Sequence, residues 1–297
     1  MNRIFAAVCL VFLPLLASAQ EYKLVWEDNF NGPVLNNSKW TAMINGEGAG
    51  NRELQYYRRE NISMGREKTT NAKCLIITAK KEKFKGSNCT SGRLDTDRKM
   101  TFKYGKVEAR IKLPKTANGL WPAFWMLGAD HKQATWPKCG EIDIMEMGKK
   151  TGIDNGVQDR YFNGACHWGE DWNGGKYPNK GISTTNAYSL QDGFHTYTLF
   201  WSPDSIKMYL DLDKYPAAKP YYTLPIMGEG KANETSRYFR KPFYLIFNLA
   251  VGGTFSEIYD IEKITALKGG EAKMYVDYVR VYQKSNGQQE ICISKRQ

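Results

Sequence analysis

Residues 106–113 read KVEARIKL, with apolar side chains at every second position from Val107 to Leu113 and charged side chains between them. Successive side chains on a β-strand point to opposite faces, so this alternation is the period of a strand. The stretch therefore predicts a strand with one face in a hydrophobic core and the other face toward solvent.

Other segments extend this prediction along the chain. Residues 205–212 show the same alternation, and residues 75–79, 243–249 and 275–282 are apolar on both faces. Strands of the second kind belong inside two packed sheets. Helical periodicity is almost absent, and Gly, Asn and Pro clusters separate the apolar runs. The sequence predicts an all-β fold, a single β-sandwich of jelly-roll type.

The 297-residue chain divides into three parts. Residues 1–19 indicate an export signal, because Arg3 precedes an apolar run over 4–16 and a small-residue cleavage pattern follows it. The run is short for a bilayer span, and its cysteine is not placed for lipid attachment. We expect a secreted or periplasmic protein without a membrane span, with one domain over 20–284 and a polar, loose tail over 285–297.

The charge of the chain is basic but dispersed. The formal net charge is +11, from 42 Lys and Arg against 31 Asp and Glu. These basic residues are scattered among acidic ones, and no nucleic-acid-binding motif accompanies them. We therefore expect a mixed basic surface and no nucleic-acid partner.

The cysteines do not indicate a disulfide scaffold or a zinc site. Six cysteines become five once the signal with Cys9 is removed, so at least one thiol stays unpaired. No pair has zinc-ligand spacing. A disulfide between Cys74 and Cys89 remains open at this stage.

The chemically informative stretch is residues 140–148, GEIDIMEMG. Glu141 and Asp143 are two positions apart, so they point to the same face of a strand. Glu146 has the wrong parity for that face, and one bulged residue around Met145 would bring it back. The stretch therefore predicts three carboxylates on one face, with Ile142 and Ile144 in the core.

Three crowded carboxyls suit glycoside cleavage with retention of configuration. Crowding raises the pKa of at least one carboxyl, so that one group is protonated while a neighbour is ionised. One carboxylate then attacks the anomeric carbon while the other, about 5–5.5 Å away, acts as acid and later as base. The same pattern also fits a solvated acidic strand edge or a Ca²⁺ site.

Two tryptophans favour the first interpretation. Residues 119–128 read GLWPAFWMLG, and Trp121 and Trp125 are four positions apart, so one strand presents both toward one cleft. Indole faces stack on the C–H faces of sugar rings. Core packing is the alternative for either residue alone, but a tryptophan pair beside a carboxylate trio indicates a carbohydrate cleft.

These motifs resemble glycoside hydrolase family 16, in its laminarinase-like branch. The resemblance covers nearly the whole chain after the signal. Besides the carboxylate and tryptophan stretches, it rests on LVWEDNF (24–30), ELQYY (53–57), SGRL (91–94), YGKVEAR (104–110), NLAVGG (248–253) and VDYVRVY (276–282).

The resemblance implies a concanavalin-like jelly roll with an open concave cleft. It implies that Glu141 is the nucleophile, that Glu146 is the general acid/base and that Asp143 tunes Glu141. The implied activity is a retaining endo-β-glucanase acting on mixed-linkage β-1,3-1,4-glucan, on β-1,3-glucan (laminarin), or on both. Such an enzyme is a monomer whose partner is the polysaccharide, with no cofactor for catalysis.

The resemblance also implies a set of substrate-binding residues. Trp121 and Trp125 would be sugar platforms, with Arg93 and Asn45 on the glycone side and His167 and Asn248 elsewhere in the cleft. Arg93 could instead cap a turn, and the loop of Asn45 could be a simple connection. Relatives of this kind often carry a structural Ca²⁺ on the convex face, for which the matching groups are the Asp277 side chain and backbone carbonyls near Glu27 and Gly65.

Two departures leave the polymer open. Lys149 and Lys150 follow Gly148 directly, and residues 254–257 read TFSE, without the Trp-containing loop of many laminarinase-like members. Both lie at the expected cleft margin, so we lean toward mixed-linkage or dual activity. The alternatives are a non-catalytic β-glucan-recognition protein, against which the three carboxylates argue, and a galactanase on an algal polysaccharide, which the positive charge favours.

Overall fold

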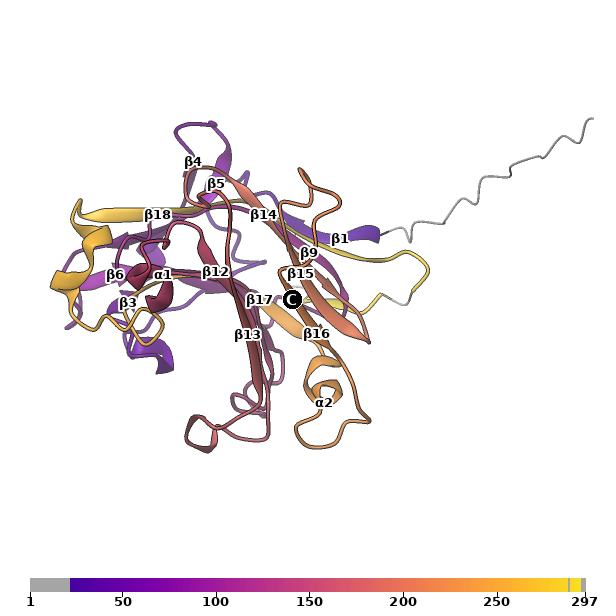
Figure 1. Ribbon diagram of the computed structural model, residues 1–297. Helices are drawn as coiled ribbons and strands as arrows, with labels where there is room; N and C mark the ends of the chain where they lie inside the picture. Colours follow the sequence, from indigo (N-terminus) through magenta and orange to yellow (C-terminus); the bar gives the residue numbers. More distant parts are fainter. Residues whose placement is uncertain (1–21, 288, 295–297) are drawn as a thin grey trace, which may run out of the picture.

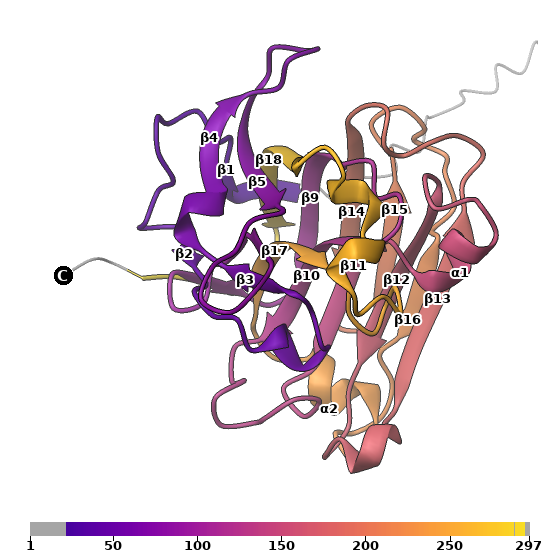
Figure 2. The ribbon, with the colours of Figure 1, turned by 90° about the vertical axis from the view of Figure 1, so that its left-hand side faces the viewer.

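The computed structural model describes residues 22–287 and 289–294, and the predicted signal lies outside this part of the chain. Two large sheets face each other and make a β-sandwich (Figures 1 and 2). Among the described residues, all strand pairs are antiparallel except the one between β3 and β6. The predicted all-β class is confirmed, and helices are confined to short connections.

We call the sheet that carries the carboxylate strand β11 the concave sheet. Its strands lie in the order β13-β12-β11-β10-β17-β7-β2, and Figure 2 shows β17, β10, β11, β12 and β13 side by side. Their bounds are β2 Thr41–Ala42, β7 Arg93–Asp95, β10 Leu120–Gly128, β11 Glu141–Met147, β12 Tyr161–His167, β13 Asn179–Thr185 and β17 Phe243–Val251, with β8 Met100–Phe102 and β19 Ile291–Ile293 joined at β17.

The convex sheet covers the other side of the core. Its strands lie in the order β16-β15-β14-β9-β18-β5-β6-β3, with β1 on β18 and β4 on β5. Their bounds are β1 Tyr22–Asp28, β3 Gln55–Tyr57, β4 Ile62–Arg66, β5 Lys73–Lys80, β6 Cys89–Ser91, β9 Gly105–Lys112, β14 His195–Trp201, β15 Ser205–Leu210, β16 Tyr222–Pro225 and β18 Glu271–Lys284.

Helical segments are short and lie in connections. Figure 1 places α1 beside β12 and α2 below β16. Their bounds are α1 Lys150–Asp154 and α2 Thr235–Phe239, with 3₁₀ turns η1 Gly48–Gly50, η2 Arg59–Asn61, η3 Asn173–Gly175, η4 Ile261–Lys263 and η5 Thr265–Leu267. Within the described residues no helix is long and apolar enough to cross a membrane.

The core forms where the alternation predicted it. On β9 the side chains of Val107, Ala109 and Ile111 are fully buried. The opposite face is less open than expected, because Glu108 is only 9% exposed. Its carboxylate accepts a hydrogen bond from Tyr278 at 3.0 Å and pairs with Lys106 at 2.8 Å, which compensates for the burial of its charge.

The tail differs from the sequence-based expectation of a loose segment. Ile291–Ile293 forms β19, which pairs with β8 from Met100 to Phe102. The reason is that β8 offers an unpaired edge, and main-chain hydrogen bonds to an edge depend little on side chains. The strand itself reads Ile-Cys-Ile, a short apolar run with two β-branched residues, so the polar average of the tail concealed it.

The five cysteines of the described part of the chain are free thiols. Cys89 lies in the main core, whereas Cys74 packs with Ile76 and Phe194 in a separate small cluster. Burial raises the pKa of both thiols to about 12. Neither forms the disulfide that the sequence left open.

Candidate active site

A bulge in β11 brings the three carboxylates to one face, as predicted. Across β10, Asp143 is opposite Trp125 while Met145 is opposite Phe124, so Ile144 is the extra residue. The pairing with β12 shifts between Asp143 and Glu146 as well. Since a bulge inserts one residue, the face of every later side chain is reversed, and Glu146 joins Glu141 and Asp143.

The carboxylates line a cavity of about 330 Å³ on the concave sheet. The predicted cleft residues Arg93, Trp121, Trp125 and Asn248 line it too. Residues that the sequence did not single out complete the wall: Ala49, Gly50, Asn51, Glu53, Ala123, Leu127 and Trp136.

Glu141 is held by a tryptophan from the preceding loop. Trp136 Nε1 donates to Glu141 Oε2 at 3.1 Å. Burial, and next the charge of Asp143, raise the pKa of Glu141 to about 8. Trp136 therefore aims this carboxylate, while its surroundings oppose its ionisation.

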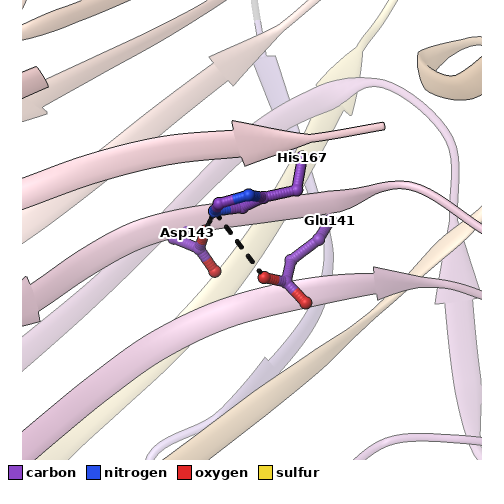
Figure 3. A group of neighbouring side chains, drawn as sticks. All are labelled: Glu141, Asp143 and His167. Atoms are coloured by element: carbon purple, nitrogen blue, oxygen red, sulfur yellow. Dashed lines mark ion pairs between the residues drawn. The ribbon is translucent and has the colours of Figure 1, made fainter. Parts of the chain in front are cut away.

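Asp143 and Glu141 both face His167 (Figure 3). His167 Nε2 lies 3.3 Å from Asp143 Oδ2 and 4.0 Å from Glu141 Oε1. The Tyr177 hydroxyl lies 3.1 Å from the other ring nitrogen and orients the imidazole. Burial raises the pKa of Asp143 well above its ordinary value, and the charge of Glu146 adds to this. The predicted cleft histidine thus contacts the carboxylates themselves.

Both oxygens of Glu146 accept hydrogen bonds. Trp121 Nε1 donates to Oε1 at 3.0 Å, and Asn163 Nδ2 donates to Oε2 at 2.8 Å. Burial raises the pKa of Glu146, whereas the His167 charge and these two donors lower it. Since the three carboxyls interact, their protons belong to the group. Such a trio can hold one protonated and one ionised carboxyl at the same pH, as acid and nucleophile require.

On the other side of β10, Arg93 and Asn248 surround Trp125. The guanidinium carbon of Arg93 lies 4.7 Å from the indole centroid, and Trp125 Nε1 donates to Asn248 Oδ1 at 2.6 Å. Arg93 Nε is buried without a hydrogen-bond partner among the described residues. A buried unpaired donor is costly unless a ligand satisfies it, so Arg93 is available to a substrate hydroxyl.

Asn45 does not line the cavity, in contrast to Arg93 and Asn248. Its backbone pairs with Tyr57. Glu53, which was not predicted, lines the cavity and accepts hydrogen bonds from Gln55 and Tyr57. Residues 53, 55 and 57 have strand parity, and this shared face was the signal that could have found Glu53.

Trp121 has one face covered. The Phe255 ring stacks on it with centroids 4.7 Å apart and planes 11° apart. Phe255 comes from the 254–257 loop that departs from the laminarinase-like pattern. The predicted platform therefore offers a sugar at most one indole face, and its ring nitrogen is committed to Glu146.

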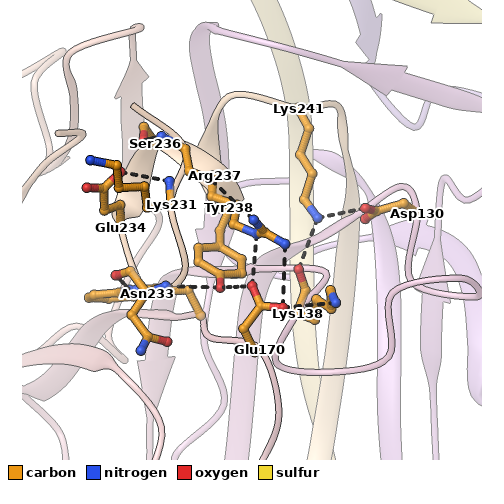
Figure 4. A network of polar contacts seen from close by, with 12 residues as sticks. Asp130, Lys138, Glu170, Lys231, Asn233, Glu234, Ser236, Arg237, Tyr238 and Lys241 are labelled. Carbon is orange, nitrogen blue, oxygen red and sulfur yellow. Dashed lines mark hydrogen bonds and ion pairs between the residues drawn. The ribbon is translucent and has the colours of Figure 1, made fainter. Parts of the chain in front are cut away.

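A polar network holds the loop that carries Trp136 (Figure 4). Lys138 pairs with Glu170 at 2.9 Å, and Glu170 pairs with Arg237 at 2.8 Å. Lys241 pairs with Asp130 at 2.7 Å, at the start of the loop. Two other chain segments, around Glu170 and over 237–241, thus hold the loop that places Trp136 beside Glu141. In the sequence, only the Trp136-Pro137 pair shortly before Glu141 could have pointed to Trp136, because contacts between loops cannot be predicted from residue spacing.

Trp136→Phe is expected to lower kcat/KM roughly 10-fold or more, because it removes a hydrogen bond to a carboxylate worth about 1.5–3 kcal/mol. Loss of that donor also raises the pKa of Glu141, so the acidic limb of the pH profile should move to higher pH. Steady-state kinetics between pH 4 and 9 test this. Trp172→Phe on the β12–β13 hairpin, where the indole is 56% exposed, is the control. Equal profiles for both variants would contradict the role of Trp136.

Two of the three groups implied for calcium, Asp277 and the Glu27 carbonyl, already have cationic partners. Arg110 Nη1 donates to Asp277 Oδ2 at 2.5 Å, and Lys39 Nζ donates to the Glu27 carbonyl at 2.5 Å. Gly65 lies on β4 and pairs with Cys74. Since calcium needs free oxygen ligands, these donors would have to move before Asp277 and Glu27 could bind it. The structural calcium stays a prediction, and so does the expectation that it takes no part in catalysis.

Comparisons with known proteins agree with this geometry. A family model described as "Beta-porphyranase A-D, GH16 domain" matches residues 24–284. The chain is 34% identical to the β-glucanase of Rhodothermus marinus, covering 89% of this chain and 86% of that protein. It is also 34% identical to the clotting factor G alpha subunit of Tachypleus tridentatus, but spans only 35% of its length.

The chain is similar to a solved structure over almost the entire length of that structure. It is the GH16 protein of the Bacteroides ovatus mixed-linkage glucan locus in complex with its G4G4G3G product. The chain is 39% identical to it, with a TM-score of 0.75, and the match covers 86% of this chain and 99% of that structure.

Proposed function

Because this chain belongs to glycoside hydrolase family 16, we propose that it is a retaining endo-β-glucanase that cuts mixed-linkage β-1,3-1,4-glucan, β-1,3-glucan or both. One observation carries the proposal. The bulge in β11 gathers Glu141, Asp143 and Glu146 in one cavity beside tryptophans. A glucan-recognition protein of the same fold would not need this complete set.

The proposed reaction is a double displacement. Glu146 donates its proton to the glycosidic oxygen while a Glu141 oxygen attacks the anomeric carbon, which breaks the bond and forms a glycosyl-enzyme ester. Glu146, now ionised, removes a proton from water, and the water oxygen displaces Glu141. Asp143 and His167 lie beside Glu141 and balance the change in charge. Arg93 and Trp125 bind the glycone sugars.

Mixed-linkage glucan is the preferred substrate in this proposal. The Bacteroides ovatus protein that binds a mixed-linkage product is 39% identical to this chain. In addition, Phe255 of the 254–257 loop, which departs from the laminarinase-like pattern, stacks on Trp121. Since loops at the cleft margin determine which linkages fit, we assign the preference to this loop.

A galactan is the second candidate substrate. The matching family model is described as a β-porphyranase domain, and the chain carries a net charge of +11, which suits a sulfated polymer. The catalytic carboxylates would act in the same way on either polymer. We also propose that the protein is exported, since residues 1–19 have the pattern of a signal, and that it acts as a monomer.

The test is incubation of the mature protein, beside Glu141→Gln, with laminarin, barley mixed-linkage glucan and agarose or porphyran. Oligosaccharides of several sizes from a glucan, absent with the variant, are expected. Retention predicts that the initial products observed by NMR have the β-configuration, and initial α-products would contradict it. Products from the galactans alone would overturn the glucanase assignment, and binding without any products would support a recognition protein.

A further inference from the structure

Two adjacent lysines after the carboxylate strand have different surroundings. Lys150 pairs with Asp154 at 2.6 Å on the surface of α1. Lys149 instead turns toward the cleft margin, where its Nζ donates to Ser183 Oγ at 3.3 Å and lies 6.0 Å from the Phe255 ring centroid. Lys149 therefore belongs to the surroundings of the active site, and Lys150 does not.

From Lys149 a chain of hydrogen bonds leads to Glu146. Ser183 Oγ donates to Asn163 Oδ1 at 3.1 Å, and Asn163 Nδ2 donates to Glu146 Oε2 at 2.8 Å. Every donor in this chain points toward the carboxylate. Such bonds polarise one another, so the ammonium at one end strengthens the bond that reaches Glu146 at the other.

The strand register places these groups in line. Glu146 on β11 is directly opposite Asn163 on β12, and Asn163 is directly opposite Ser183 on β13. Directly opposed side chains on one face are the closest cross-strand neighbours. The bulge that turns Glu146 into the cleft is therefore also what brings it onto this row.

We propose that Lys149 is a positioning residue for the general acid/base, holding Glu146 and stabilising its ionised form through Ser183 and Asn163. The inference rests on the proposed function, in which Glu146 first donates a proton and then accepts one. The ionised form is required in the second step, so a cation at the far end of the row assists hydrolysis of the glycosyl-enzyme.

The charged groups around Glu146 determine the direction of its pH dependence. Asp143 and Glu141 on the same strand oppose its ionisation, and His167 on β12 favours it. Burial raises the pKa of Glu146, while His167, the two donors and Lys149 lower it. Removal of the Lys149 charge should therefore raise the pKa of Glu146.

The experiment compares Lys149→Met with Lys150→Met, a lysine-to-methionine change one position away. The pH dependence of kcat/KM is measured on the preferred glucan and on an aryl β-glycoside whose leaving group needs no acid. For Lys149→Met on the glucan, the alkaline limb should move up by roughly 0.3–0.7 pH unit, as for a partly exposed charge. KM should be unchanged, Lys149→Arg should restore the profile, and Lys150→Met should match the unsubstituted protein.

The outcomes separate this inference from the proposed function. An unshifted alkaline limb in Lys149→Met would refute the proposed role of Lys149. A raised KM without a shift of the limb would refute it too, because it would show that Lys149 binds sugar instead. Glu146→Ala tests the underlying function: it should lose activity on glucan, retain cleavage of the aryl glycoside and be rescued by azide. If Glu146→Ala retains full activity on glucan, the proposed function itself fails, whatever Lys149 does.

Discussion

Glu141→Gln is expected to reduce kcat/KM on the preferred glucan by roughly 10⁴- to 10⁶-fold, the range seen when a catalytic nucleophile is removed. An amide oxygen cannot form the glycosyl-enzyme ester, while Trp136 Nε1 can still donate to it, as it does to Glu141 Oε2 at 3.1 Å. The cleft should therefore keep its shape, and oligosaccharide binding should persist. Kinetics and calorimetric binding measure the two effects separately.

The same variant should be more stable than the unsubstituted protein at alkaline pH. The pKa of Glu141 is raised to about 8 by burial and by Asp143, so the folded state keeps a proton that the unfolded chain releases near pH 4.5. Stability of the unsubstituted protein therefore falls as pH rises between these values, and Gln removes this loss. We expect the free energy of unfolding of the variant to exceed that of the unsubstituted protein by about 1–3 kcal/mol at pH 8. This is less than the shifted pKa of Glu141 alone would give, because the three carboxyls share their protons.

A matched glutamate provides the control. Glu229 is 86% exposed at its side chain, so Glu229→Gln should change neither activity nor the pH dependence of unfolding. Denaturant unfolding at pH 4.5 and pH 8 gives the comparison. Equal stability of Glu141→Gln and the unsubstituted protein at both pH values would contradict the raised pKa of Glu141.

Phe247→Ala is expected to destabilise the fold by about 3–5 kcal/mol, which corresponds to a decrease of roughly 10 °C in Tm. Phe247 is fully buried on β17 and stacks on Phe124 of β10 with centroids 4.6 Å apart. Trp40 contacts it from the side, with centroids 5.8 Å apart. Truncation leaves a cavity between the sheets that these large rings cannot fill without moving.

The activity of the folded fraction should survive this change. Phe247 points into the core, while the next residue, Asn248, faces the cleft and holds Trp125. Thermal unfolding and kcat below the transition test the two statements. Met227→Ala, at a side chain that is 66% exposed, is the control. A loss below about 1 kcal/mol would show that the core collapses around the cavity.

Most of the fold was predictable because strands follow from the alternation of apolar and polar side chains along the chain. The alternation over 106–113 predicted β9, and the parity of Glu141 and Asp143 against Glu146 predicted the bulge in β11. The edge strand β19 was missed, because an unpaired edge exists only once β8 has folded. The burial of Glu108 was missed for a similar reason, since Tyr278 is 170 positions away in the sequence.

The residues of the candidate active site were predictable to the same extent. The carboxylates, Trp121 and Trp125 lie on single strands, so their spacing indicated a shared face. Trp136 was not predicted, since its contact with Glu141 depends on a loop fixed by ion pairs from other segments. Phe255 was noted only as a departure, although it covers one face of Trp121.

The sequence by itself determined which chemical groups each strand presents to the core and which to the cleft, because the side-chain period of a strand is a local property of the backbone. Only the tertiary structure decided which groups meet across strands. Sheet order and register place Asn163 and Ser183 in line with Glu146, and Lys149 reaches the end of that row. These contacts join residues up to 34 positions apart, as for Lys149 and Ser183, and no local period specifies them.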